Sequence, residues 1–136
     1  MELTDATRQT AGVLLIAITF VEYGGTFLLR VVGGGNAFTP FQKAFFRAGH
    51  AHAGVLVILS LLALLYADTL ALGGFGRFGA RSAIPLAAIL MPAGFFFSAL
   101  GRGRERANRL IVLVYLGAAS LAIGVVTLGL ALLGGV

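Results

Sequence analysis

Long runs of apolar residues alternate along this chain with short segments that are rich in glycine or arginine. Four runs reach the length of roughly 20 residues that a helix needs to cross the hydrocarbon core of a bilayer. They cover residues 10–32, 45–66, 82–100 and 110–134. Because the runs are continuous rather than alternating, and too few to close a β-barrel, they predict transmembrane helices.

The segments between the runs are short, so neighbouring helices are expected to be antiparallel. Residues 33–43 are rich in glycine, residues 68–81 hold four glycines, and residues 101–109 are basic. We therefore expect a single integral membrane domain of the all-α class, a four-helix transmembrane bundle with up-down-up-down topology.

Composition supports a membrane protein and excludes several other classes. Hydrophobic residues make up 59% of the chain and charged residues 11%, whereas soluble domains have about 25% charged residues. The mean hydropathy is +0.99. These values exclude a soluble globular enzyme and a disordered tail. The absence of cysteine excludes disulfides, a thiolate nucleophile and zinc or iron–sulfur sites that use cysteine ligands.

The basic residues predict an orientation in the membrane. The first and third loops with their flanks hold seven lysines and arginines, against three in the N-terminal segment and second loop. The positive-inside rule therefore places the first and third loops in the cytoplasm and both termini outside. A bacterial-type cytoplasmic membrane and an uncleaved N-terminus are expected, because the first seven residues are acidic rather than basic.

The net charge of +5 does not require a nucleic-acid partner. The arginines of Arg102–Arg109 lie in a short loop beside the membrane, where anionic lipid headgroups are their expected contacts. The Gly74–Gly79 segment has a GxGxxG pattern, but no strand precedes it, so we expect no nucleotide site there. The lipid bilayer is the expected partner.

One face of the first apolar run is polar. Its residues stand at helical spacing and are Thr19, Glu22, Tyr23, Thr26 and Arg30. Polar side chains are costly in hydrocarbon, so this face is expected to meet the interior of the bundle or a partner subunit. Glu22 lies near mid-membrane, where a carboxyl is either neutral or paired. A polar clamp between helices would explain the same residues.

The second run contains the only two histidines, His50 and His52. Neutral imidazole is a common metal ligand. Side chains two residues apart point about 200° apart on a helix, so the two cannot hold one metal ion unless the helix is broken. One histidine could instead be an axial haem ligand, because small residues up to Gly54 would let a flat macrocycle approach. Alternatively, His50 lies in a helix interface and His52 bonds Glu22 or a backbone carbonyl.

The third and fourth runs add further candidates. Met91-Pro92 predicts a kink, because proline leaves the carbonyl of Ala88 without its helical donor. Small residues spaced from Gly117 to Thr127 predict a packing face, within the chain or between subunits. Four side chains lie within about 6 Å of one depth, at a helical rise of about 1.5 Å per residue, and so could share a pocket. They are Glu22, His52, Met91 and Tyr115.

Short motifs spread over most of the chain resemble a known family. They are Phe46-Arg-Ala-Gly-His50, Gly54-Val-Leu-Val-Ile, Ala93-Gly-Phe-Phe-Phe-Ser98, the basic loop with Asn108-Arg109, and the Tyr115-Leu-Gly start of the last run. The arrangement resembles the small four-span membrane isomerases typified by styrene oxide isomerase, with hydroxylaminobenzene mutase as a relative. The family's Asn-Gly pair after the histidine is absent, since position 56 is Leu.

The resemblance implies a homo-oligomer, a trimer in that family, in which a second-span histidine ligates haem b. The ferric iron would act as a Lewis acid on an epoxide oxygen, and a hydride shift would give a carbonyl product. By this resemblance the ligand is His50, whereas the depth of the residues favours His52.

Three functions remain open. The first is a haem-b membrane protein that isomerises small apolar substrates, and the second is a small proton-coupled transporter or exporter that uses Glu22. The third is a structural or accessory subunit. For the first function, the candidate residues are Glu22, Tyr23 and Tyr115 for catalysis, His50 and His52 as metal ligands, and Gly54 and Met91 as further cofactor contacts.

Overall fold

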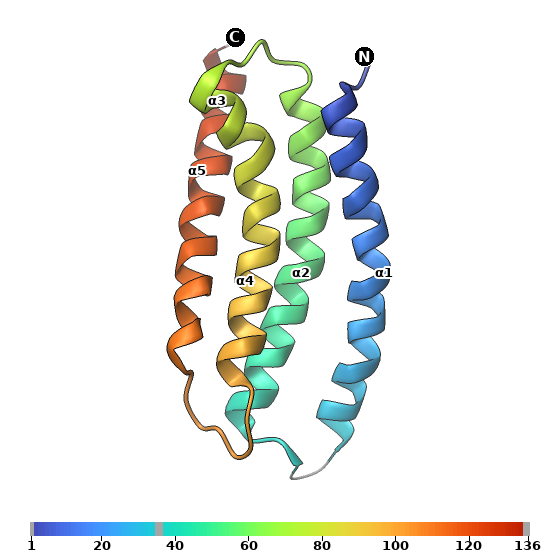
Figure 1. Cartoon of the computed structure of the whole chain (residues 1–136), viewed down its shortest axis with the longest axis vertical. Coiled ribbons are helices and arrows are strands. Elements are labelled where there is room, and N and C mark those ends of the chain that lie inside the picture. Colours follow the sequence, from blue (N-terminus) through green and yellow to red (C-terminus); the bar gives the residue numbers. More distant parts are fainter. Residues whose placement is uncertain (1, 35–36, 135–136) are drawn as a thin grey trace.

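The computed structural model describes residues 2–34 and 37–134. Four helical segments of membrane-spanning length and apolarity stand side by side in antiparallel order (Figure 1). They are α1 (Asp5–Gly33), α2 (Pro40–Ala67), a third segment made of α3 (Gly74–Phe78), the π-helical turn η2 (Gly79–Ala83) and α4 (Ile84–Ala99), and a fourth made of the 3₁₀ turn η3 (Arg109–Ile111) and α5 (Val112–Gly134). The described residues contain no strand. The predicted all-α four-helix bundle is confirmed.

The first two helices begin before their apolar runs because threonines cap them. α1 begins at Asp5 rather than at residue 10, and the Thr4 hydroxyl accepts a hydrogen bond from the backbone N–H of Thr7 at 3.3 Å. α2 begins at Pro40 rather than at residue 45, where Thr39 and Gln42 form a reciprocal capping box. The caps are polar, so hydropathy alone does not locate them.

The third segment is not one regular helix. Gly74 has a φ of 50°, a left-handed conformation that favours glycine, and the short α3 passes into the π-helical turn η2 before α4 begins. α4 then continues through Pro92 to Ala99. The predicted apolar span is therefore preceded by a short additional helix, α3, which lies at the end of the bundle where α1 begins (Figure 1).

The small residues of α5 form a packing face within the chain. Gly117, Ser120 and Gly124 are buried, and the Ser120 hydroxyl donates to the carbonyl of Ala83 at 2.7 Å. Across this contact, a Cβ at Gly94 would lie 2.6 Å from the backbone nitrogen of Val114. The helices thus approach as closely as small residues allow, and the predicted packing face is used between α4 and α5.

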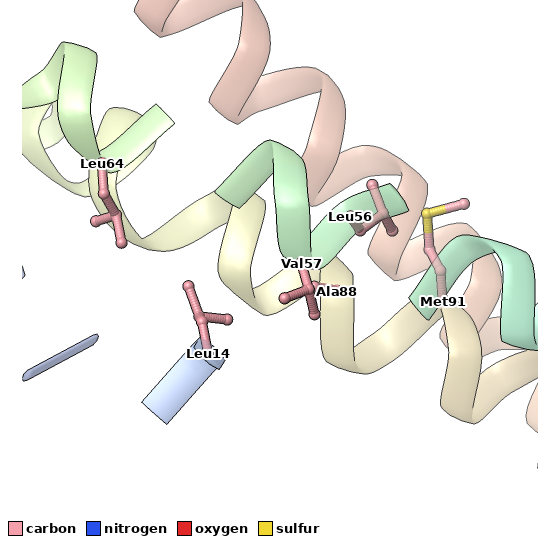
Figure 2. Packing of buried hydrophobic residues seen from close by; sticks show 6 residues of the cluster. All are labelled: Leu14, Leu56, Val57, Leu64, Ala88 and Met91. Carbon is pink, nitrogen blue, oxygen red and sulfur yellow. The ribbon is translucent and has the colours of Figure 1, made fainter. Parts of the chain in front are cut away.

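α1 packs loosely against the other helices. Of its 29 residues only Thr7, Leu14 and Val31 are buried. Leu14 is the one α1 member of a buried cluster that otherwise belongs to α2 and α4 (Figure 2), with Leu56, Val57, Leu64, Ala88 and Met91. The compact core therefore lies among α2, α4 and α5, and α1 stands at its side.

Candidate functional site

A cavity of about 460 Å³ lies between α1, α2 and α4. We call it the His50 groove, because His50 is the only titratable side chain among its lining residues. The other lining residues are Thr10, Val13, Leu14, Ala17, Phe20, Val21, Gly24, Ala53, Val57, Pro85, Ala88, Ile89 and Phe96. An apolar cavity of this size with very few polar groups is typical of a small-molecule site.

His50 lies against the backbone of α1. A Cβ added at Gly24 would lie 3.6 Å from its Nδ1, and one added at Gly25 would lie 3.7 Å from its Nε2. The imidazole therefore lies between α1 and α2, close to the backbone of Gly24 and Gly25. Within the described residues neither ring nitrogen makes a hydrogen bond, and neither is fully buried. The imidazole of His50 is thus free to bind a ligand atom or a metal ion.

His52 points to a different neighbour. Its Nδ1 lies 2.7 Å from the carbonyl oxygen of Ala48, and its ring centre lies 4.9 Å from that of Phe95 on α4. Because a carbonyl oxygen only accepts, Nδ1 carries the proton and donates it. α2 is unbroken from Pro40 to Ala67. The two histidines therefore face different helices, as their spacing predicts. His52 bonds a backbone carbonyl, as expected if it has a structural role and does not bind a cofactor.

The other proposed cofactor contacts lie apart from each other. A Cβ at Gly54 would meet nothing within 4 Å, so this part of α2 has an open surface. Met91 is buried in the core cluster and faces Gly117 of α5. Neither residue lines the His50 groove.

The proposed catalytic residues lie on the outer surface of the single chain. Tyr23 is 75% exposed and Tyr115 is 67% exposed, and Glu22 is also exposed. The hydroxyls of Thr19 and Thr26 donate to carbonyls of their own helix at 2.7 Å. Of the two locations expected for this polar face, the interior of the bundle is therefore wrong, and a partner subunit stays a prediction. Equal depth does not bring these side chains into one pocket.

The groove also borders a backbone acceptor. Pro92 has no N–H group, so the carbonyl of Ala88 lacks the donor that a regular helix would provide. Ala88 lines the groove. The sequence identifies this carbonyl through Pro92, but only the structure shows that Ala88 lines the groove.

A polar cluster at the start of α1 was not predicted from the sequence. Asp68 and Arg81 form an ion pair there, with side chains 0% and 19% exposed. The backbone N–H of Thr4 donates to Asp68 Oδ2 at 3.0 Å, and the Thr7 hydroxyl donates to Oδ1 at 2.9 Å. The sequence does show two residues of opposite charge, Asp68 and Arg81, on either side of the segment that joins α2 to η2.

The cluster changes the acidity of Asp68. Burial alone raises the pKa of this carboxyl, but hydrogen bonds from Thr4 and Thr7 and the positive charge of Arg81 act in the other direction. The pKa of Asp68 is lowered as a result from its ordinary value of 3.8. The carboxylate is therefore the form that holds the start of α1.

No group of three or more histidine, cysteine, aspartate or glutamate side chains converges in the described part of the chain. Comparisons of the chain with protein-family models, curated proteins and solved structures found no match. The proposal for the protein's function is therefore based on the geometry of the His50 groove.

Proposed function

We propose that this integral membrane protein binds a flat, largely apolar cofactor in the His50 groove, with His50 as its single polar anchor. The observation that carries the proposal is an imidazole without a hydrogen-bond partner in the described structure, placed in an otherwise apolar cavity. Haem b, the group implied by the sequence resemblance, would be held in this groove by the imidazole of His50 and by the apolar side chains around it.

The residues of the groove fit such a group. His50 would supply a nitrogen ligand, and Gly24 beside it adds no side chain to the groove. Val57 and Phe96 supply apolar walls that exclude water. When bound, ferric haem would supply a Lewis acid for the isomerisation of small apolar epoxides.

The exposed polar face of α1 gives the proposal a second part. A carboxyl at mid-membrane is costly when it faces hydrocarbon. We propose that a second copy of the chain covers Glu22 and Tyr23, as in the trimer implied by the resemblance. Tyr115, which is exposed on α5, would reach a site only through such an assembly. These three residues would then position substrate rather than hold the cofactor.

The proton-coupled transporter has less support. Glu22 would have to line the path of the substrate, but it is absent from the lining of the His50 groove. An accessory subunit would account for the exposed polar face of α1, but it would leave the free imidazole of His50 without a role.

An absorption spectrum tests the cofactor proposal. Protein extracted from membranes supplied with haemin is expected to show a Soret band, and His50→Gly is expected to lose it and regain it with added imidazole. His52→Ala is the matched control, since this variant removes the other histidine and should keep the band. The proposal would be refuted if the wild-type protein showed no Soret band. It would also be refuted if the band of His50→Gly equalled that of His52→Ala.

Activity is tested separately with the loaded protein. Conversion of an aryl epoxide to its carbonyl isomer is expected, and its absence in haem-loaded protein would exclude the isomerase while leaving haem binding intact.

A further inference from the structure

Two hollows meet at the end of the bundle where α1 begins. One, of about 500 Å³, is lined by Thr4, Ala6, Asp68, Leu70, Ala71, Leu72, Arg77 and Arg81. The other, of about 340 Å³, is lined by Ala6, Thr7, Thr10, Leu64, Gly74, Arg77, Phe78, Arg81 and Ser82. Arg77 and Arg81 line both hollows, so the two arginines stand at their common boundary.

The hollows differ in chemistry along the length of α1. The first lies beside Asp68, just beyond the end of α2, where lipid headgroups are expected in a spanning bundle. The second continues toward the membrane between Leu64 and Phe78. It shares Thr10 with the His50 groove, so the hollows and the groove follow one another along the same side of α1. The walls become less polar from the first hollow to the second, which suits an amphiphile.

Arg77 carries a positive charge at this boundary that no ion pair in the described residues neutralises. Arg81 is neutralised by its ion pair with Asp68, and Asp5 on the first turn of α1 is paired with Arg8. Arg77 makes no ion pair in the described residues, and its Nε donates to the carbonyl of Leu72 at 2.9 Å. This bond orients the guanidinium at the hollow while leaving its other N–H groups for an anion.

We infer that these hollows bind an anionic phospholipid of the bilayer, with its phosphate at Arg77 and one acyl chain along Leu64 and Phe78. Arginine binds phosphate oxygens through charge-assisted hydrogen bonds. A bilayer lipid is favoured over a soluble phosphate because the polar hollow adjoins a less polar one, lined in part by Leu64 and Phe78, at the level expected for the membrane boundary. This site does not depend on the proposed function, because it uses neither His50 nor a cofactor.

Native mass spectrometry of the reconstituted protein tests this inference. Vesicles contain equal amounts of phosphatidylglycerol and phosphatidylcholine with identical acyl chains, and the lipids that remain bound after extraction are counted. Wild-type protein is expected to retain phosphatidylglycerol preferentially. Arg77→Gln is expected to lower this preference about tenfold, the effect of losing one charge-assisted hydrogen bond. Arg8→Gln, which removes an exposed arginine of α1 that lines neither hollow, should leave the preference unchanged.

A second variant tests the apolar part of the site. Ala6→Phe fills the space that both hollows share without a change in charge, and both lipids should be retained less. Addition of inorganic phosphate should not displace the bound lipid, whereas displacement would indicate a site for free phosphate. Equal lipid preferences in Arg77→Gln and Arg8→Gln, with Ala6→Phe retaining lipid as the wild-type protein does, would overturn the inference.

Discussion

Asp68 and Arg81 form an ion pair between the end of α2 and the π-helical turn that precedes α4. The same pair binds the first turn of α1, because the guanidinium of Arg81 donates to the hydroxyls of Thr4 at 3.0 Å and Thr7 at 2.9 Å. Three segments that are distant in the sequence are therefore joined by one charged cluster.

Asp68→Asn is expected to lower the free energy of unfolding by roughly 1–3 kcal/mol, because it removes charge-assisted bonds and leaves Arg81 without its counter-charge. Thermal unfolding in detergent measures this change. Asp5→Asn is the matched control, since Asp5 forms an exposed pair with Arg8 and should contribute less than about 1 kcal/mol. Equal losses in the two variants would contradict the role of the cluster.

The stability of the protein should fall at acid pH through Asp68. Its pKa is lowered in the folded state, so its contribution is complete above the ordinary value of 3.8 and is lost as pH falls toward the lower folded-state value. Unfolding measured as a function of pH should show a steeper acid loss in the wild-type protein than in Asp68→Asn. Parallel curves would show that Asp68 does not titrate in this way.

Gly94→Ala is expected to destabilise the bundle by about 1–3 kcal/mol, because the new methyl group would meet the backbone of Val114, which cannot move aside as a side chain can. Gly12→Ala is the contrasting change. A Cβ at Gly12 meets nothing within 4 Å, and alanine should stabilise α1 by up to about 1 kcal/mol. Thermal unfolding of the two variants should therefore shift in opposite directions.

Gly24→Leu is expected to weaken haem binding at least about tenfold, since a large side chain would enter the groove beside His50. Gly33→Leu is the control, because a Cβ at Gly33 meets nothing within 4 Å and the residue lies outside the groove. Titration with haemin, followed by the Soret band, compares the two. Equal affinities would place the cofactor elsewhere.

The apolar runs predict the bundle because hydrophobicity and length determine which segments span a membrane. They do not predict the third segment in detail, where Gly74 and the π-helical turn η2 create an irregular start. The starts of α1 and α2 depend on side-chain hydrogen bonds of Thr4 and Thr39. Hydropathy contains no information on such bonds.

The candidate site was predictable only in part. Helical geometry correctly predicts that the side chains of His50 and His52 point to different sides of α2, because their directions depend on that one helix alone. The location of Glu22 depends on how α1 is rotated against its neighbours, and residue depth does not determine that rotation. The same reason explains Met91, which faces Gly117 instead of the groove.

The loose packing of α1 determines how the imidazole can be reached. With only Thr7, Leu14 and Val31 buried, a small outward movement of this helix separates few contacts and leaves the interface of α4 and α5 intact. A hydrophobic ligand of the proposed kind would therefore enter sideways, from among the acyl chains. For such a molecule, concentration in the lipid phase sets occupancy more directly than concentration in the surrounding water.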